Sequence, residues 1–218
     1  MTREEILSHV DHTLLAPDAT WSQVKTLCDQ AKKYRTASVC VSPCQVERAA
    51  EYLGAELPVC TVIGFPSGAA TTKSKVFEAA DAISKGAREI DMVINIGLAK
   101  EGAYSQVEAD IRAVKAVCGD HILKVIVETC LLTREEKIAL CGCVTRAGAD
   151  YIKTSTGFSA GGATREDVAL LRRYSGPQVK VKAAGGIQSF QDGEDFLALG
   201  ADRLGPSRLV KLMEAQNA

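Results

Sequence analysis

Lysines stand inside three short apolar runs of this sequence, and an aspartate stands inside a fourth. Lys124, Lys153 and Lys182 each follow an isoleucine, leucine or valine, and Asp91 lies between Ile90 and Met92. A lysine forms an imine only as the neutral amine, so its ordinary pKa of ~10.4 must be suppressed by a nearby ammonium or by partial desolvation. A carboxylate close by could carry the protons of such a reaction. These residue types therefore point to carbonyl chemistry through an imine.

The alternation of side chains along a strand decides which of these groups share one face. In the run Glu89–Asn95, the large apolar side chains of Ile90, Met92 and Ile94 share one parity, and Glu89, Asp91, Val93 and Asn95 share the other. Asp91 then points to the opposite face, toward the inside of a barrel, and the same alternation places Lys124, Lys153 and Lys182 inside. Several lysines and one carboxylate are therefore expected to meet in one cavity.

An inward lysine can also be a structural group, because its ammonium can extend to the barrel mouth or form an ion pair. For Lys153 and Lys182, on neighbouring strands with Asp91 nearby, the functional interpretation is favoured. Clustering buried cations is costly unless their charge is used or suppressed. A neutral lysine beside an ammonium and a proton-carrying carboxylate is the arrangement expected of a class I aldolase.

Short β-branched runs alternate with longer charged segments of helical periodicity along the whole chain, which indicates a repeated βα unit. The expected strands are Val10–Leu14, Ala37–Val41, Val59–Ile63, Glu89–Asn95, Ile122–Glu128, Tyr151–Thr154, Val179–Ala183 and Arg203–Leu204. The expected helices are Trp21–Tyr34, Gln45–Leu53, Thr72–Lys85, Tyr104–Val117, Arg134–Ala147, Arg165–Tyr174, Phe190–Leu199 and Ser207–Gln216.

Eight strands and eight helices predict an α/β fold, a single-domain (β/α)₈ TIM barrel over residues 1–218. The rival is a doubly wound open sheet, but its usual G-x-G-x-x-G after the first strand is missing. The glycine loops come late instead, at Gly185-Gly186-Ile187 and Gly205-Pro206-Ser207. Barrels commonly hold phosphate with the loops after strands seven and eight, so the late loops favour the barrel.

The composition excludes some partners and locations. With 26 basic and 27 acidic residues the formal net charge is −1, which gives no electrostatic reason to expect a nucleic acid or an anionic membrane. The longest stretch without charged residues, Leu57–Thr72, carries prolines and glycines and is too short to span a bilayer. Met1–Glu5 passes straight into charges with no apolar signal segment, so a cytoplasmic location is expected.

Eight cysteines lie mostly in apolar runs of a chain large enough to fold without bridges, so reduced thiols are expected. Neither Cys141-Gly-Cys143 nor Cys40-x-x-x-Cys44 has a matching second pair or a histidine cluster, and no metal site is predicted.

An ordered set of motifs resembles the deoxyribose-phosphate aldolase family, from about Val10 to Leu209. The motifs are Val10-Asp11-His12-Thr13-Leu14-Leu15, Val62-Ile63-Gly64-Phe65-Pro66, Glu89-Ile90-Asp91-Met92-Val93-Ile94-Asn95, Tyr151-Ile152-Lys153-Thr154-Ser155-Thr156-Gly157 and Val181-Lys182-Ala183-Ala184-Gly185-Gly186-Ile187. Gly-Gly-Ile loops occur in many phosphate-binding barrels, but the set together with Lys-Thr-Ser-Thr-Gly is specific.

The resemblance implies a role for each matching residue. Lys153 would be the Schiff-base lysine, Lys182 the neighbouring cation that favours its neutral amine and transfers protons, and Asp91 the general acid and base. Water and substrate hydroxyls would be oriented by Asp11, Thr13, Lys124 and Thr156. As an alternative, these four are polar residues whose hydrogen bonds are satisfied inside the barrel and which take no part in the reaction. Cys40 would lie near the aldehyde. A buried thiol with only a structural role is equally expected at this position.

For the substrate phosphate, the resemblance implies amide donors and one hydroxyl: Gly157, Gly185, Gly186, Gly205 and Ser207. Two positions depart from the family pattern. Gln188 stands where members often carry arginine, and Pro206 and Arg208 alter a loop that usually reads Gly-Ala/Thr-Ser-Ser. We expect Arg208 to compensate for the arginine absent at position 188.

The resemblance implies reversible cleavage of 2-deoxy-D-ribose 5-phosphate to D-glyceraldehyde 3-phosphate and acetaldehyde, as in deoxyribose catabolism. No metal or organic cofactor is expected, because the protonated imine is itself the electron sink. Two alternatives remain at this point: a phosphosugar epimerase or isomerase without an imine, and a barrel that binds without catalysis. A homodimer or homotetramer is expected for a soluble enzyme of this kind. A monomer stays an alternative, because no exposed apolar stripe in the sequence identifies an interface.

Overall fold

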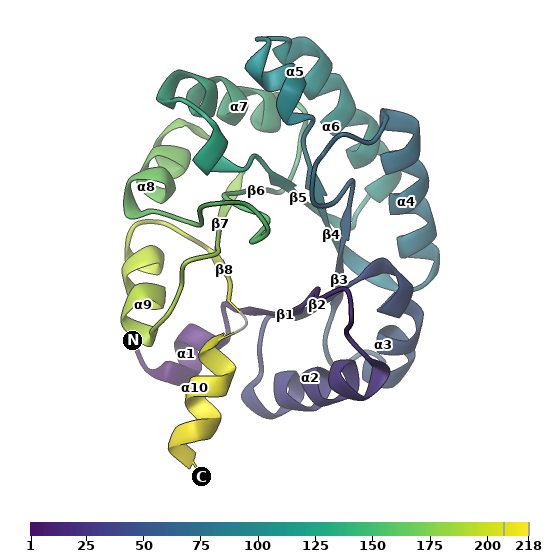
Figure 1. Ribbon diagram of the computed structural model, residues 1–218, viewed down its shortest axis with the longest axis vertical. Coiled ribbons are helices and arrows are strands. Elements are labelled where there is room, and N and C mark those ends of the chain that lie inside the picture. The colour runs from purple at the N-terminus through teal and green to yellow at the C-terminus, as the bar shows by residue number, and fades with distance from the viewer. Residues whose placement is uncertain (207, 218) are drawn as a thin grey trace.

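The computed structural model describes residues 1–206 and 208–217 of the chain. Eight parallel strands follow one another around a barrel in sequence order, and a parallel bridge between Val10 and Leu204 joins the last strand to the first (Figure 1). The strands are β1 (Asp11–Leu14), β2 (Ser38–Val41), β3 (Val59–Ile63), β4 (Ala87–Val93), β5 (Ile122–Ile126), β6 (Tyr151–Lys153), β7 (Lys180–Ala184) and β8 (Arg203–Gly205). The predicted (β/α)₈ barrel is confirmed.

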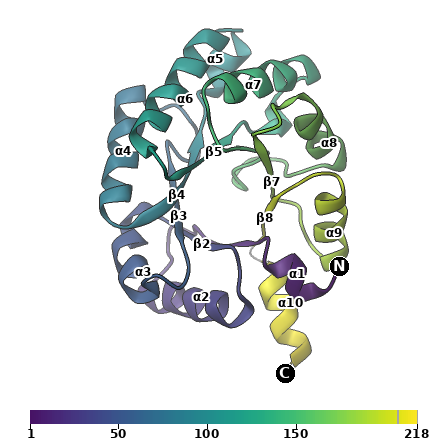
Figure 2. The ribbon, with the colours of Figure 1, turned by 180° about the vertical axis from the view of Figure 1, so that it is seen from behind.

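Most helices surround the strands as an outer ring, whereas the last helix of the chain projects away from it, as both views show (Figures 1 and 2). The helices are α1 (Arg3–Leu7), α2 (Trp21–Tyr34), α3 (Val46–Leu53), α4 (Thr72–Ser84), α5 (Ile96–Lys100), α6 (Tyr104–Cys118), α7 (Arg134–Arg146), α8 (Arg165–Tyr174), α9 (Phe190–Ala198) and α10 (Arg208–Asn217). Two short 3₁₀ helices, Pro43–Gln45 and Thr129–Leu131, lie in loops. No helix among residues 1–206 and 208–217 is long and apolar enough to cross a bilayer.

The ends of the main helices follow from local sequence. Thr20 and Thr133 form capping boxes with Gln23 and Glu136, so the side chain of each threonine accepts the amide N–H three residues later. At the other end, Gly200 follows α9 with a φ of +100°, and a Cβ there would lie 2.7 Å from the side chain of Arg172. Only glycine fits this position.

Two short helices, α1 and α5, were not predicted from the sequence. Each has only five residues, so neither gives a helical periodicity to read. In α1, the hydroxyl of Thr2 caps the helix, and Ile6 and Leu7 are buried in the main core. Asn95 was expected at the end of a strand, but its side chain accepts the amide of Leu98 and begins α5. The strand therefore ends at Val93.

The two faces of the strands bury different residues. On the outer face, Ile90 and Met92 pack with the helices in a continuous apolar core. On the inner face, charged groups are buried, among them Asp91 and Lys124, each with no exposed surface. A small separate apolar cluster of Cys40, Cys60 and Val62, with Leu15 and Phe65 packed against it, lies beside these charges. Strand alternation therefore separates a hydrophobic shell from a polar interior.

Candidate active site

Lys153 is the last residue of β6 and lies at the carboxyl end of the barrel, where barrel enzymes place their chemistry. Its side chain is 5% exposed, and its Nζ donates to Asp91 Oδ2 at 2.7 Å. Lys182 of β7 donates to the same oxygen, also at 2.7 Å. The two ammonium groups are therefore neighbours that share one carboxylate oxygen.

Asp91 of β4 is at the centre of the site. Its second oxygen, Oδ1, accepts from Lys124 Nζ at 2.8 Å and from the Cys60 thiol at 3.1 Å. Burial favours the protonated acid, but Lys124, Lys153 and Lys182 outweigh it and hold the pKa of Asp91 well below its usual value. Before substrate binds, Asp91 is therefore a carboxylate that can accept a proton.

A second carboxylate, Asp11 of β1, holds Lys182 from the other side at 2.5 Å. Asp11 also accepts from the Ser38 hydroxyl at 2.7 Å and from Arg203 Nη1 at 2.5 Å. Burial lowers the pKa of Lys182, but the charges of Asp11 and Asp91 outweigh this and raise it above its usual value. Lys182 is therefore a permanent cation next to Lys153.

Lys124 of β5 lies deeper in the barrel. Its Nζ is 2.5 Å from Glu89 Oε2, 2.8 Å from Asp91 Oδ1 and 3.5 Å from Asp11 Oδ2. Burial lowers its pKa, but these carboxylates raise it well above the usual value. A fully buried ammonium with these partners fixes the carboxylates below the cavity.

A cavity of about 1100 Å³ opens above this network. Its wall contains seven of the thirteen residues that the sequence singled out: Thr13, Lys153, Thr156, Gly157, Gly185, Gly186 and Gly205. Five others are buried below it: Asp11, Cys40, Asp91, Lys124 and Lys182. The last, Ser207, lies outside the described residues. Within the ion network of the described residues, Lys153 alone forms part of the cavity wall.

The glycine loops at the cavity rim have the backbone that amide donors need. Gly157, Gly185 and Gly186 have φ values of +84°, +75° and +76°, in the left-handed region. A Cβ on Gly185 would lie 3.0 Å from the Cα of Gly162, so the two loops pack closely. Arg208 also reaches this rim, where its Nη1 donates to Gln188 Oε1 at 2.9 Å.

Hydroxyl groups at the rim are tied to protein partners. Thr13 Oγ1 donates to the backbone oxygen of Asp11 at 2.9 Å. Thr156 Oγ1 donates to Glu128 Oε2 at 2.5 Å and accepts the amide of Phe158 at 3.0 Å. Since the single proton of Thr156 is committed to Glu128, this hydroxyl offers the cavity only a lone pair.

Glu128 was expected to continue a strand, but its backbone is left-handed, with φ 58° and ψ 66°. The strand ends at Ile126, and the buried Glu128 carboxylate turns toward Thr156 instead, where it accepts both the hydroxyl and the amide. Non-glycine residues rarely adopt this conformation, and it is retained where surrounding contacts impose it.

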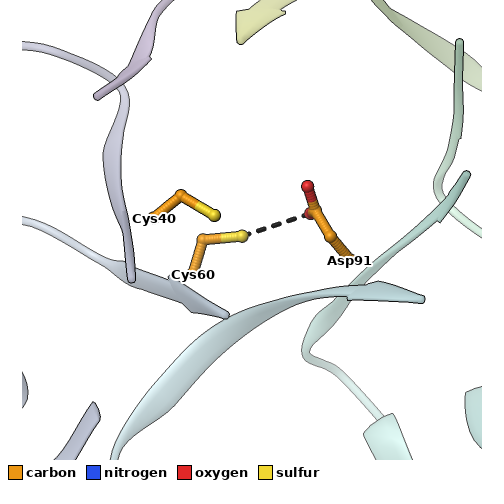
Figure 3. A group of neighbouring side chains, drawn as sticks. All are labelled: Cys40, Cys60 and Asp91. Atoms are coloured by element: carbon orange, nitrogen blue, oxygen red, sulfur yellow. Dashed lines mark hydrogen bonds between the residues drawn. The ribbon is translucent and has the colours of Figure 1, made fainter. Parts of the chain in front are cut away.

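Cys40 of β2 and Cys60 of β3 lie opposite each other in the strand register, and their thiols point toward Asp91 (Figure 3). A hydrogen bond with Cys60 lowers the pKa of Cys40, whereas burial raises the pKa of Cys60 well above its usual value. Ligand atoms of Cys40, Cys60 and Asp91 lie within 4.8 Å of one another and could surround a cation. However, Lys124 already contacts both Cys60 and Asp91, so the local charge disfavours a further cation.

Sequence reasoning missed four residues of the site: Cys60, Glu89, Glu128 and Arg203. Glu89 shares the inward parity of Asp91, and Arg203 opens the last expected strand, so both carried a weak signal. Their contacts join distant strands, since Arg203 pairs with Asp11 across 192 positions of sequence. Such pairs depend on how the barrel closes rather than on local sequence.

Fold and site together define a (β/α)₈-barrel enzyme with a lysine at the floor of its cavity. A family model described as DeoC/LacD family aldolase matches residues 6–199, and the chain belongs to this family. It is 58% identical to a deoxyribose-phosphate aldolase of Streptococcus agalactiae over 99% of this chain and 97% of that protein. The resemblance read from the motifs is confirmed, and the chain is an aldehyde-lyase.

Solved structures agree with this assignment. A structure from Coccidioides immitis superposes with a TM-score of 0.95 and 44% identity, covering 100% of this chain and 88% of that one. A tetrameric deoxyribose phosphate aldolase from Aeropyrum pernix superposes with a TM-score of 0.87 and 34% identity, covering 100% of this chain and 93% of that one.

Proposed function

We propose that the protein cleaves 2-deoxy-D-ribose 5-phosphate reversibly to D-glyceraldehyde 3-phosphate and acetaldehyde through an imine on Lys153. The observation that carries this proposal is the position of Lys153. Its amino group reaches the cavity, while the carboxylate that it contacts is shared with the permanently charged Lys182. The name of the Streptococcus agalactiae relative supports the substrate.

The first half of the reaction forms the imine. The neutral amine of Lys153 attacks C1 of the open-chain aldehyde, and the carbinolamine then loses water to give a protonated imine. Lys182 contributes fixed positive charge beside the attacking nitrogen, which favours the neutral amine. Asp91 accepts and returns protons during these steps, through a water or directly.

The second half breaks the bond between C2 and C3, since acetaldehyde retains the first two carbons. A base takes the proton of the C3 hydroxyl, C3 becomes the aldehyde of glyceraldehyde 3-phosphate, and the bonding electrons pass into the imine to leave an enamine. Protonation at C2 and attack by water release acetaldehyde and restore the amine. Asp91, which its low pKa keeps as a carboxylate, would take this proton through a bridging water, since it is buried below the cavity wall.

The phosphate would bind at the rim, at the amides of Gly157, Gly185, Gly186 and Gly205. Arg208 is proposed to supply the positive charge that an arginine at position 188 would give. Its hydrogen bond to Gln188 supports this, because the contact brings the guanidinium next to position 188. Ser207 keeps its expected role as a hydroxyl donor.

The test is reductive trapping. The protein is incubated with acetaldehyde and borohydride, and intact mass and peptide mapping locate the adduct. One ethyl group on the Lys153 peptide, absent from folded Lys153→Leu, is the expected result. Lys100→Leu, which removes a surface lysine, is the matched control and should trap normally. A folded protein that gives no adduct would overturn the imine and support a non-covalent phosphosugar enzyme or a binding barrel.

We infer a homodimer or homotetramer in the cytoplasm, acting in deoxyribose catabolism. The tetrameric Aeropyrum pernix relative supports association, as does Phe77 on α4, which is 72% exposed. Light scattering coupled to gel filtration measures the assembly, and a monomer at micromolar concentration would contradict this part.

A further inference from the structure

The last helix, α10, forms one side of the cavity, although it projects away from the ring of the other helices (Figures 1 and 2). Arg208, Lys211 and Leu212 belong to the cavity wall. Leu209 and Val210 anchor the first turn of the helix in the main core, where neither has any exposed surface. The place of Arg208 at the cavity rim therefore depends on how α10 is oriented over the barrel.

A chain of side-chain hydrogen bonds runs from α10 to the first strand of the barrel. Gln30 of α2 donates from Nε2 to Glu214 Oε2 of α10 at 2.8 Å. On its other side, Gln30 Oε1 is 2.9 Å from Nε2 of the buried His12. His12 lies on β1 between Asp11 and Thr13. The chain therefore joins α10 to the strand that carries two residues of the site.

The chemistry of the partners gives each link of this chain one direction. A carboxylate only accepts, so Gln30 presents its amide nitrogen to Glu214 and its oxygen to His12. That oxygen also only accepts, so Nε2 of His12 carries the ring proton. Burial lowers the pKa of His12, which favours this neutral ring over the imidazolium. A flipped amide would set its oxygen against the Glu214 carboxylate, so the chain holds α10 in one arrangement.

A second hydrogen bond holds α10 from the side of the loop between β7 and α9. Arg208 Nη1 donates to Gln188 Oε1 at 2.9 Å. Gln188 and Gln30 are both part of the cavity wall, so the two bonds act on α10 from the two flanks of the same cavity. Loss of the bond from Gln30 would let the outer part of α10 move away from α2. The guanidinium of Arg208 would then shift at the rim.

We propose that Gln30 is a positioning residue that holds α10 against α2, so that Arg208 meets the substrate phosphate. It acts through Glu214 and the helix rather than on the reacting bond, which lies near Lys153. The inference rests on the proposed function, because it assumes that Arg208 binds the phosphate of 2-deoxy-D-ribose 5-phosphate.

Steady-state kinetics on the phosphorylated and the free sugar test this proposal. Gln30→Leu removes both hydrogen bonds and should raise KM for 2-deoxy-D-ribose 5-phosphate by about fivefold, the size of one lost hydrogen bond, with kcat nearly unchanged. The value of kcat/KM for 2-deoxyribose, which has no phosphate, should not change. Gln30→Glu sets two carboxylates face to face and should raise KM for the phosphorylated sugar further.

A swapped pair separates positioning from a general loss of stability. When Gln30→Glu is combined with Glu214→Gln, the carboxylate at position 30 can accept from both His12 and the amide at position 214. Both hydrogen bonds re-form, and KM should return to within about twofold of the parent value. Gln30→Leu combined with Arg208→Ala should have the KM of Arg208→Ala alone, because both changes remove the same phosphate contact.

Thr26→Val is the matched control. Thr26 lies on the same helix and in the same cavity wall, but its hydroxyl donates to the backbone oxygen of Ser22. Its KM should equal the parent value. A folded Gln30→Leu protein with the parent KM would overturn the inference and make Gln30 a structural residue, as would effects of Gln30→Leu and Arg208→Ala that simply add.

If Gln30→Leu does not fold, Gln30→Glu and the swapped pair decide in the same way. A parent KM in Gln30→Glu, or a swapped pair no better than Gln30→Glu alone, would overturn the inference. A parent protein that does not cleave 2-deoxy-D-ribose 5-phosphate would instead refute the proposed function.

Discussion

Below the cavity, charged side chains from β1, β4, β5, β6, β7 and β8 hold one another in a buried network, whereas the rim above is made of glycine-rich backbone and a few polar side chains. Each carboxylate below has at least two basic partners. At the rim, Arg208 donates to the neutral side chain of Gln188. The floor is therefore preorganised for one chemistry, while the rim can vary between relatives without disturbing it.

The largest effect should come from breaking the floor at its shared carboxylate. Asp91→Asn removes the negative charge that Lys124, Lys153 and Lys182 share. We expect a loss of about 3–5 kcal/mol in the free energy of unfolding, because buried ammonium groups are left uncompensated. We also expect kcat to fall by at least about 100-fold, because proton transfer is lost. Urea unfolding and steady-state kinetics measure both, and a fully active variant would contradict the role given to Asp91.

The floor should also control stability in acid. The pKa values of Asp11 and Asp91 are depressed in the folded protein. Their contribution is fully present above the ordinary carboxylate pKa of about 3.9, and it is lost as the pH falls below that value toward the folded pKa. Unfolding followed by circular dichroism should show a steep loss of stability below about pH 4 that is reduced in Asp91→Asn. If the free energy of unfolding falls with pH equally steeply in both proteins, the buried network is not the source of the acid sensitivity.

At the rim, Arg208→Ala should raise KM for the phosphorylated sugar by about tenfold and leave kcat nearly unchanged, since one charge-assisted contact to phosphate is lost. Activity on unphosphorylated 2-deoxyribose should not change, which separates a phosphate contact from a general defect. Lys211→Ala, which removes a second basic residue of the cavity wall, is the matched comparison. An unchanged KM in Arg208→Ala would rule out the proposed compensation.

The smallest effect should come from Glu128→Gln, which keeps the shape of the side chain but removes its charge. The hydrogen bond from Thr156 is weakened, and a loss of about 1 kcal/mol in the free energy of unfolding is expected. KM should rise by about threefold as the loop before Gly157 loosens. Thermal unfolding measures the change in stability, and steady-state kinetics measure the change in KM. A change in kcat alone would show that Glu128 acts on the chemistry instead.

The sequence alone places a side chain correctly where the two-residue period of a strand decides which face of the sheet it lies on. Asp91, Lys153 and Lys182 could be placed inside the barrel because apolar neighbours mark the opposite face. Parity did not reveal how far a strand continues, and Asn95 and Glu128 leave their strands to cap a helix and to hold a loop. In both cases a side-chain contact outweighs the strand propensity of the segment.

Partners across the barrel could not be predicted from sequence. Arg203 and Asp11 come from the last and first strands, and their meeting depends on barrel closure and on the stagger of the strands. Lys124 was expected to orient substrate, yet it lies among carboxylates below the cavity. Its inward direction follows from parity, but its depth depends on register, which the sequence of a single strand does not contain.

The pairing of Asp11 with Arg203 has a consequence for how the chain folds. Because the first and last strands supply opposite charges to one cluster, a partial barrel would leave buried ions without their counterions. Half-barrels should therefore gain little stability on their own, and folding should be a single cooperative event that is completed only after the eighth strand has been made. Newly synthesised chains would then remain unfolded until nearly the whole sequence has left the ribosome.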